Sequence, residues 1–109
     1  MNIGLFIKDF EFGIKISEKL SEFELSFDFC DTHSDIMDET HLIIVDLDDI
    51  NNGDVHFIRQ LYGKNNNARI IGFMKQVQKD QHTIFKNAGC NMILPKSSLI
   101  KNIETFIDD

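Results

Sequence analysis

The segment Leu42-Ile43-Ile44-Val45-Asp46 decides the fold, because four consecutive apolar residues lead directly into a carboxylate. An unbroken apolar run of this length is typical of a strand that is covered on both faces, as strands are in a parallel sheet. We therefore expect a buried central strand that carries Asp46 to its carboxyl end.

Four further segments on either side of this strand have strand-like patterns. Residues 3–7 and 70–74 are short, nearly continuous apolar runs, and residues 92–94 form a shorter one. Residues 23–29 alternate strictly between apolar and polar side chains, which predicts a half-buried strand at the edge of the sheet.

Apolar residues at helical spacing separate these strands. They predict helices over residues 12–20, 55–62, 77–88 and 99–107, whereas the polar residues 31–40 have room only for a brief helix around Ile36 and Met37. Gly89 is expected to end the third of the long helices in a left-handed conformation. Ser97 or Ser98 is expected to cap the start of the last helix.

Five strands that alternate with single helices predict a doubly wound, flavodoxin-like α/β sandwich in one domain, residues 1–109. With the alternating strand at the edge, the order of the parallel strands is 2-1-3-4-5. In such sheets a ligand site lies at the carboxyl ends of the strands where the winding reverses, here between the first and third strands.

The composition excludes several classes of protein. The chain has 109 residues with 11 Lys+Arg against 18 Asp+Glu, a net charge of −7 that argues against nucleic acid as the partner. Its apolar runs are too short to span a membrane, and its two cysteines indicate a reduced, cytoplasmic protein.

Cys30 and His33, with His41, have the spacing of metal ligands, but a core thiol and loop histidines explain them more simply.

Three charged residues should meet at the carboxyl end of this sheet: Asp9, Asp46 and Lys96. Two neighbouring carboxylates repel each other unless a divalent cation such as Mg²⁺ or an ammonium group lies between them. A carboxylate can also accept a phosphoryl group, whose oxygens Lys96 could contact. Each residue alone could equally be a solvated residue at the end of a strand.

With these residues in place, the whole chain resembles the receiver domains of two-component response regulators, the CheY-like fold. The resemblance rests on residues 42–48, which match the phospho-acceptor strand, and on residues 88–96, which lead to the lysine of the family. It implies that Asp46 is the phospho-acceptor and that Lys96 contacts the phosphate. It also implies that Asp9, Asp46 and the backbone carbonyl of Asp48 bind Mg²⁺.

Three positions depart from the pattern of the family. Lys8 replaces the first of two acids, Met74 replaces a hydroxyl donor and Ile93 replaces an aromatic residue. One carboxylate fewer weakens Mg²⁺ binding, and Lys8 could form an ion pair with Asp46 or Asp9 and take the place of the metal. Asp48 and Asp49 could supply a replacement ligand.

The resemblance implies an atypical, non-enzymatic receiver domain in phosphorelay signalling with a degenerate pocket. Its partners would be a histidine kinase or phosphotransfer protein, a downstream protein or a second copy. The implied contact surface is the face formed by the last two helices and the fifth strand, with the following candidate residues: His82, Lys86, Asn91, Lys101 and Glu104.

Two alternatives are a pseudo-receiver that is never phosphorylated and a flavodoxin-like binder of small ligands. The second alternative lacks a glycine-rich phosphate loop after the first strand.

Overall fold

A five-stranded parallel sheet forms the centre of the molecule in the computed structural model, which describes residues 2–65 and 67–107. The strand order is β2-β1-β3-β4-β5, as predicted, so the molecule is a doubly wound α/β sandwich. The strands are β1 (Asn2–Phe6), β2 (Ser26–Phe29), β3 (Thr40–Asp46), β4 (Arg69–Met74) and β5 (Met92–Pro95).

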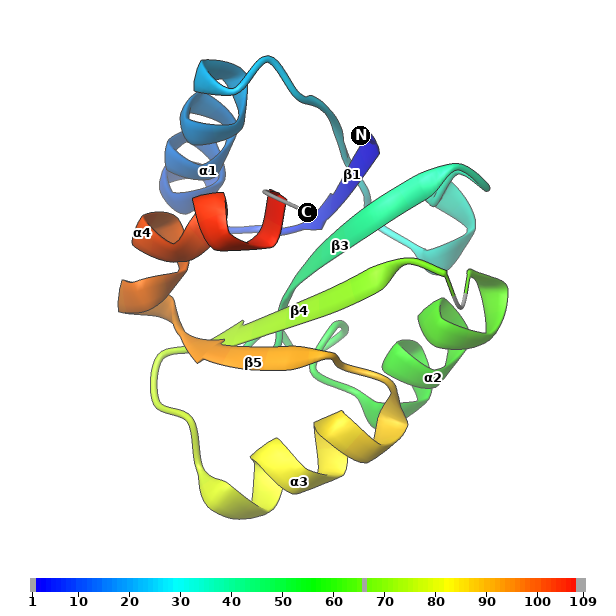
Figure 1. Ribbon diagram of the computed structural model, residues 1–109. Helices are drawn as coiled ribbons and strands as arrows, with labels where there is room; N and C mark the ends of the chain where they lie inside the picture. Colours follow the sequence, from blue (N-terminus) through cyan, green and yellow to red (C-terminus); the bar gives the residue numbers. More distant parts are fainter. Residues whose placement is uncertain (1, 66, 108–109) are drawn as a thin grey trace.

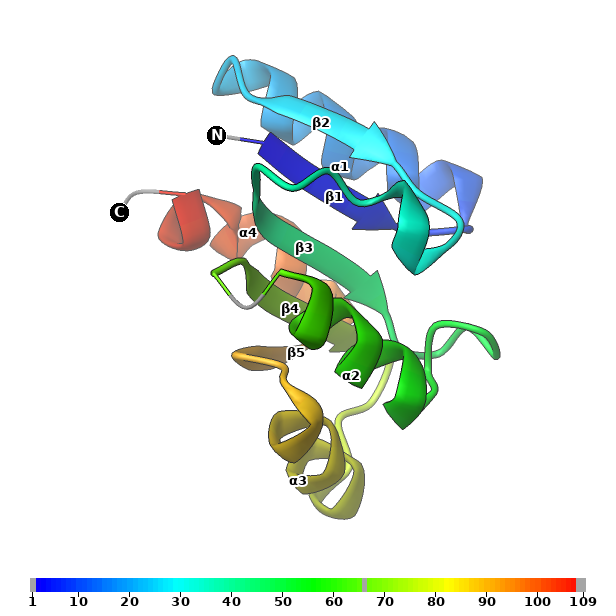
Figure 2. The ribbon, with the colours of Figure 1, turned by 90° about the vertical axis from the view of Figure 1, so that its right-hand side faces the viewer.

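Helices cover both faces of this sheet (Figures 1 and 2). The helices α1 (Phe10–Glu22) and α4 (Lys96–Ile107) lie on one face, and α2 (Val55–Lys64) and α3 (Lys79–Ala88) lie on the other. Because side chains alternate along β3, Ile44 packs with the α1–α4 layer, while Ile43 and Val45 pack with the α2–α3 layer. The apolar run around Ile43 is therefore buried on both sides, which explains why it lacks the polar alternation of an edge strand.

The brief helix predicted around Ile36 and Met37 lies a few residues earlier in the structure. It is a single 3-10 turn at His33–Asp35, and Ile36 itself is extended and buried. Side chains satisfy the backbone of this segment instead. The Asp35 carboxylate accepts the N–H groups of Asp31 and Thr32, and Lys64 Nζ donates to the carbonyls of His33 and Ser34.

Two boundaries differ from the prediction by three residues. The edge strand begins at Ser26 rather than residue 23, because Phe23 still caps α1 and Glu24 has a positive φ of 57°. Helix α4 begins at Lys96, directly after β5, so Ser97 and Ser98 lie inside its first turn and do not cap it. Gly89 has the predicted positive φ, 139°, at the end of α3.

In the described part of the chain, every helix is too short or too polar to cross a lipid bilayer.

Candidate functional site at the carboxyl end of the sheet

The predicted acid Asp46 is the last residue of the central strand β3 and lies level with Phe73 of β4. Its carboxylate is partly buried, and Oδ1 accepts the N–H of Asp48 at 3.0 Å. Leu47, which follows it, continues the ladder by donating its N–H to the carbonyl of Phe73. Asp46 is thus held where the sheet ends and the β3–α2 loop begins.

Burial raises the pKa of Asp46 above its ordinary value, and the negative charges of Asp48 and Asp49 raise it further. The N–H of Asp48 and the charge of Lys96 act in the opposite direction and only partly offset the burial. The fold therefore favours the protonated form of Asp46 relative to the unfolded chain.

Asp9 follows the neighbouring strand β1 by three residues and has a different environment. It is the N-cap of α1, where Oδ1 accepts the N–H of Phe12 at 3.2 Å. Its Oδ2 accepts a hydrogen bond from Lys96 Nζ at 3.1 Å, and this bond is also an ion pair. The Phe12 N–H and then Lys96 lower the pKa of Asp9 below its ordinary value.

The ammonium group of Lys96 is therefore directed toward α1. Its Nζ lies 4.7 Å from the centre of the Phe12 ring, so that an aromatic face and a carboxylate both hold it. Sequence reasoning missed Phe12, which entered only as the first residue of the helix predicted over residues 12–20. Its position three residues after the Asp9 cap was the available signal.

Lys8 forms an ion pair with a different acid from the ones predicted. Its Nζ lies 3.8 Å from Asp49 Oδ2, so the expected pairing with Asp46 or Asp9 is wrong. The reason lies in the β3–α2 loop. Asp49 Oδ2 also accepts the N–H groups of Asn51 and Asn52, which fixes this carboxylate on the side of the loop near Lys8.

The side chain of Asp48 is also used within the fold, because Oδ2 accepts the N–H of Lys75 at 2.8 Å just after β4. Sequence reasoning missed Asn52, which is 1% exposed and donates from Nδ2 to the carbonyl of Phe6 at 3.3 Å. This bond ties the β3–α2 loop to the end of β1. The available signal was the Asn52-Gly53 pair between the strand that ends at Asp46 and the helix predicted over residues 55–62.

The two apolar departures from the family pattern are buried at the same end of the sheet. Met74 is the last residue of β4 and lies level with Pro95, and Ile93 lies level with Gly72. Both pack in the α2–α3 core cluster. Neither side chain can donate a hydrogen bond to an oxyanion, since the Met74 sulfur is only a weak acceptor.

The predicted Mg²⁺ ligands do not fit a resident metal in this arrangement. Both oxygens of Asp9 already accept hydrogen bonds, one from Phe12 and one from Lys96, and Asp46 Oδ1 accepts the Asp48 N–H. A cation with the octahedral requirements of Mg²⁺ would have to displace the Lys96 ammonium group. Over residues 2–65 and 67–107, no group of three or more His, Cys, Asp or Glu side chains is placed to hold a metal ion.

The histidine and cysteine side chains that had metal-ligand spacing are used separately. Cys30 is buried and its thiol lies 3.8 Å from the carbonyl of Asp28, while His41 Nδ1 accepts the N–H of Asn2. Cys90 is also a free, buried thiol, and burial raises its pKa to about 12. The two cysteines therefore belong to the core, and His41 bonds to the first residue of β1.

Comparison with protein families finds no family model that matches the chain, and no curated protein matches it either. Solved structures do match over nearly the whole chain. One is a response regulator from Burkholderia pseudomallei with a phosphorylated aspartic acid, a calcium ion and citrate, at 16% identity and a TM-score of 0.82. The match covers 94% of this chain but only 63% of that one, so this chain spans less than two thirds of its length.

Two orphan response regulators have similar structures. One is from H. pylori, with 16% identity, a TM-score of 0.77 and 96% of this chain and 94% of that chain covered. The other is an atypical orphan protein described as having a phosphorylation-independent regulatory mechanism, with 17% identity, a TM-score of 0.76 and coverage of 99% and 96%. The chain has the fold of a response-regulator receiver domain. At these identities the receiver fold is what the likeness establishes, and the roles of Asp46, Asp9 and Lys96 stay predictions.

Proposed function

We propose that the chain is an atypical, non-enzymatic receiver domain of two-component signalling that acts through protein contacts without phosphorylation of Asp46. The observation that carries this proposal is the ion pair of 3.1 Å between Lys96 and Asp9. It joins the lysine expected to contact a phosphoryl group to an acid expected to bind Mg²⁺. Each residue therefore occupies the other's functional group in the resting protein.

Three further features support a pocket that works without metal. Lys8 stands at the position of a second acid and is paired with Asp49. Met74 and Ile93 place apolar side chains where the family has a hydroxyl and an aromatic ring. One of the similar structures carries the description of a phosphorylation-independent mechanism, so the receiver fold is compatible with such a role.

The partners that the resemblance implies belong to this proposal: a histidine kinase or phosphotransfer protein, a downstream protein, or a second copy of the chain. The implied contact face corresponds to α3, β5 and α4. Of its candidate residues, Lys86, Asn91, Lys101 and Glu104 are exposed and His82 is half-buried. Lys86 is partly engaged within the chain, because its Nζ donates to the carbonyl of Asn91. A cytoplasmic location goes with these partners.

A titration with Mg²⁺ and beryllofluoride tests the proposal, with amide NMR spectra of the ¹⁵N-labelled protein as the measurement. We expect no saturable shift of the amides around Asp46 at millimolar Mg²⁺, because the acids are already bonded within the chain. The matched control is Asp46→Asn. A saturable response in the wild type that Asp46→Asn abolishes would contradict the proposal.

A gain-of-function variant checks the assignment of the pocket. The double variant Lys8→Asp, Met74→Thr should bind Mg²⁺ at least tenfold more tightly than the wild type, because it adds a carboxylate beside Asp9 and a hydroxyl on β4. Mg²⁺ affinity is measured by the same amide shifts. Equal affinity of the variant and the wild type would show that these two positions do not face the pocket.

The second candidate function is phosphoryl acceptance at Asp46. The position of this acid favours it, since Asp46 ends the central strand at the winding reversal and Lys96 is near enough to lower its pKa. In that case the carboxylate would attack the phosphorus of a donor, and the leaving group would depart with the bonding electron pair. The beryllofluoride titration separates the two functions, because only an accepting Asp46 gives a saturable response.

A further inference from the structure

A second hollow opens at the carboxyl end of the sheet, on the side of α2. Its volume is about 480 Å³, within the range of roughly 300 to 1,000 Å³ that small-molecule sites have. We call it the polar cleft, and it is lined by Lys8, Asp31, Thr32, His33, Asn51, Asn52 and Phe57. These residues come from the segments that follow β1, β2 and β3 and from the start of α2.

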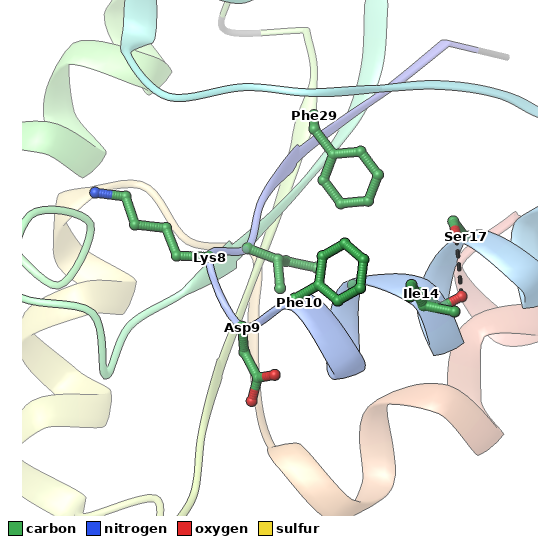
Figure 3. A pocket seen from close by; sticks show the side chains of 8 residues that line it. Lys8, Asp9, Phe10, Ile14, Ser17 and Phe29 are labelled. Atoms are coloured by element: carbon green, nitrogen blue, oxygen red, sulfur yellow. Dashed lines mark hydrogen bonds between the residues drawn. The ribbon is translucent and has the colours of Figure 1, made fainter.

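The path of the chain around the cleft explains why it is open. Residues 31–39 contain only the short turn η1 (His33–Asp35), where a longer helix would fill more of the space. Figure 2 shows this turn and the β3–α2 loop at the arrowhead end of the strands. In Figure 3 the Lys8 side chain extends away from the rings of Phe10 and Phe29, and its ion pair with Asp49 places it on the side of the same loop.

The amide group of Asn52 in the wall of the cleft is only half satisfied. The residue is 1% exposed, and Nδ2 donates to the carbonyl of Phe6 at 3.3 Å. Over residues 2–65 and 67–107, Oδ1 has no hydrogen-bond partner. The amide cannot turn over, because Oδ1 would then face the carbonyl oxygen of Phe6. A buried acceptor that is fixed in this way calls for a donor from outside the chain.

Asp31 supplies a second unpaired acceptor. Its backbone N–H donates to Asp35, but its own carboxylate forms no hydrogen bond or ion pair within the described part of the chain. It lines the cleft from the segment after β2, whereas Asn52 lines it from the segment after β3. A ligand between these segments therefore meets a negative charge and a neutral oxygen, and both accept hydrogen bonds.

The charges of the lining select a positively charged ligand. Lys8 is the one Lys or Arg among the lining residues, and Asp49 already pairs with it at 3.8 Å. A phosphate or carboxylate ligand would meet Asp31 without an unpaired cation to balance it. A primary ammonium group has the complementary properties, since it carries a positive charge and three donors. Phe57 adds an aromatic ring to the lining, and aromatic faces attract cations.

We propose that the polar cleft binds a primary ammonium group, carried by a small amine or by a lysine side chain of another protein, through Asn52 Oδ1 and the Asp31 carboxylate. Asn52 Oδ1 lies below the surface of the cleft, so side chains at the rim turn aside as the ammonium group binds. Asn51 is exposed there and is bonded only through its backbone N–H. The inference goes beyond the proposed function and does not depend on whether Asp46 accepts a phosphoryl group.

Three small molecules of similar shape test the proposal: n-butylammonium chloride, sodium butyrate and 1-butanol. Each is titrated into the full ¹⁵N-labelled chain at constant ionic strength. We expect butylammonium to give saturable shifts of the Asn52 side-chain amide and of the backbone amides of Asp31 and His33. It should bind roughly tenfold or more tightly than butanol, because its hydrogen bonds are charge-assisted, and butyrate should give no saturable shift.

Two further probes distinguish the sources of the ammonium group. Putrescine represents a small free amine, and a lysine blocked at its α-amino and carboxyl groups represents the side chain of a protein. Tighter binding of putrescine supports the first source, and tighter binding of the blocked lysine supports the second.

Substitutions in the chain localise the binding. Asp31→Asn should weaken binding of butylammonium roughly tenfold or more, because the charge in the cleft is lost. Asp38→Asn is the matched control, since it removes the same charge from an exposed residue of the same segment outside the lining. Asn52→Ala, which removes Oδ1, should also weaken binding, and thermal unfolding shows whether this variant is folded. If it is not, the comparison of Asp31→Asn with Asp38→Asn still decides.

Several results would overturn the proposal. They are the lack of a saturable shift with butylammonium, equal binding of butylammonium and butanol, and equal weakening by Asp31→Asn and Asp38→Asn. Shifts confined to the amides around Asp46 would assign the ammonium group to the strand-end acids and overturn it as well. A bound water that contacts the Asn52 side-chain amide, together with no response to butylammonium, would assign Oδ1 to an internal water instead of a ligand.

Discussion

At the scale of single residues, the two strand-end acids respond to the fold in opposite ways. Burial raises the pKa of Asp46, and the Phe12 N–H together with Lys96 lowers the pKa of Asp9. Ionised Asp9 therefore stabilises the folded state, whereas ionised Asp46 opposes it. The difference comes from bonding partners, because Asp9 caps a helix and meets an ammonium group, while Asp46 faces two further acids.

The first prediction at this scale concerns Asp46→Asn. An amide still accepts the N–H of Asp48 but carries no charge, so the variant should be more stable at pH 7. We expect a gain of a few tenths to about 1 kcal/mol, small because the group is only half-buried and solvent screens it. The measurement is urea unfolding as a function of pH.

The sign of the pH dependence follows from the raised pKa. Below the unfolded pKa of 3.8, Asp46 is protonated in both states, so the variant should have no electrostatic advantage. The advantage should grow as the pH rises through the folded pKa and then level off. A gain that is largest in acid would show that burial does not control this group.

The second prediction concerns Asp9→Asn, which keeps a helix cap but loses the ion pair with Lys96. Because the folded pKa of Asp9 lies below 3.8, the stability that it contributes is fully present above that pH and is lost as the pH falls through the folded pKa. We expect a lower melting temperature than that of the wild type at pH 7 and equal values in strong acid. An unchanged melting temperature at pH 7 would mean that the ion pair adds nothing to stability.

At the scale of elements, the β3–α2 loop is the part that positions the site. Asp46, Asp48 and Asp49 enter it in succession, and Asn52 ties it to β1. Gly53 allows its tight path, because a Cβ there would overlap the carbonyl oxygen of Leu47 and lie 2.9 Å from that of Asp49. This close approach of backbone to backbone leaves no flexible side chain that could move aside.

The prediction for this loop compares two glycines. Gly53→Ala should destabilise the protein by about 2 kcal/mol or more, because the clash is with backbone atoms. Gly63→Ala is the matched control: it lies in the last turn of α2 with nothing within 4 Å, and it should stabilise by about 0.5 kcal/mol. Chemical denaturation measures both. A mild effect of Gly53→Ala would mean that the loop relaxes and does not fix the acids.

Some of these elements could be predicted from the sequence, and others could not. The strand order could be predicted because unbroken apolar runs such as residues 42–45 and 70–74 indicate covered strands, whereas the alternation over residues 23–29 indicates an edge strand. The segment around Ile36 could not, because its backbone is satisfied by the distant Lys64 and by the Asp35 side chain. The partners of Lys8 and Lys96 also escaped prediction, since a long side chain reaches several acids and the loop geometry selects among them.

At the scale of the whole molecule, the net charge of −7 is distributed unevenly. Two of the acids at the carboxyl end of the sheet, Asp9 and Asp49, have local lysine partners, so part of the repulsion there is cancelled within the site. Other charges lie on helices and turns, where ion pairs such as Lys19–Glu22 are at the surface and like charges repel over a distance that salt shortens. The folded state therefore holds more mutual repulsion than the expanded chain.

The last prediction follows from this imbalance. Raising NaCl from about 0.01 M to about 0.15 M shortens the screening length from about 30 Å to about 8 Å, and we expect the melting temperature to rise. Lys101→Gln makes the exposed face of α4 one charge more negative and should increase this rise, whereas Glu104→Gln should decrease it. Both residues are exposed on the same helix, so the pair controls for local effects. A melting temperature that falls with salt would show that the two ion pairs at the site outweigh the dispersed repulsion.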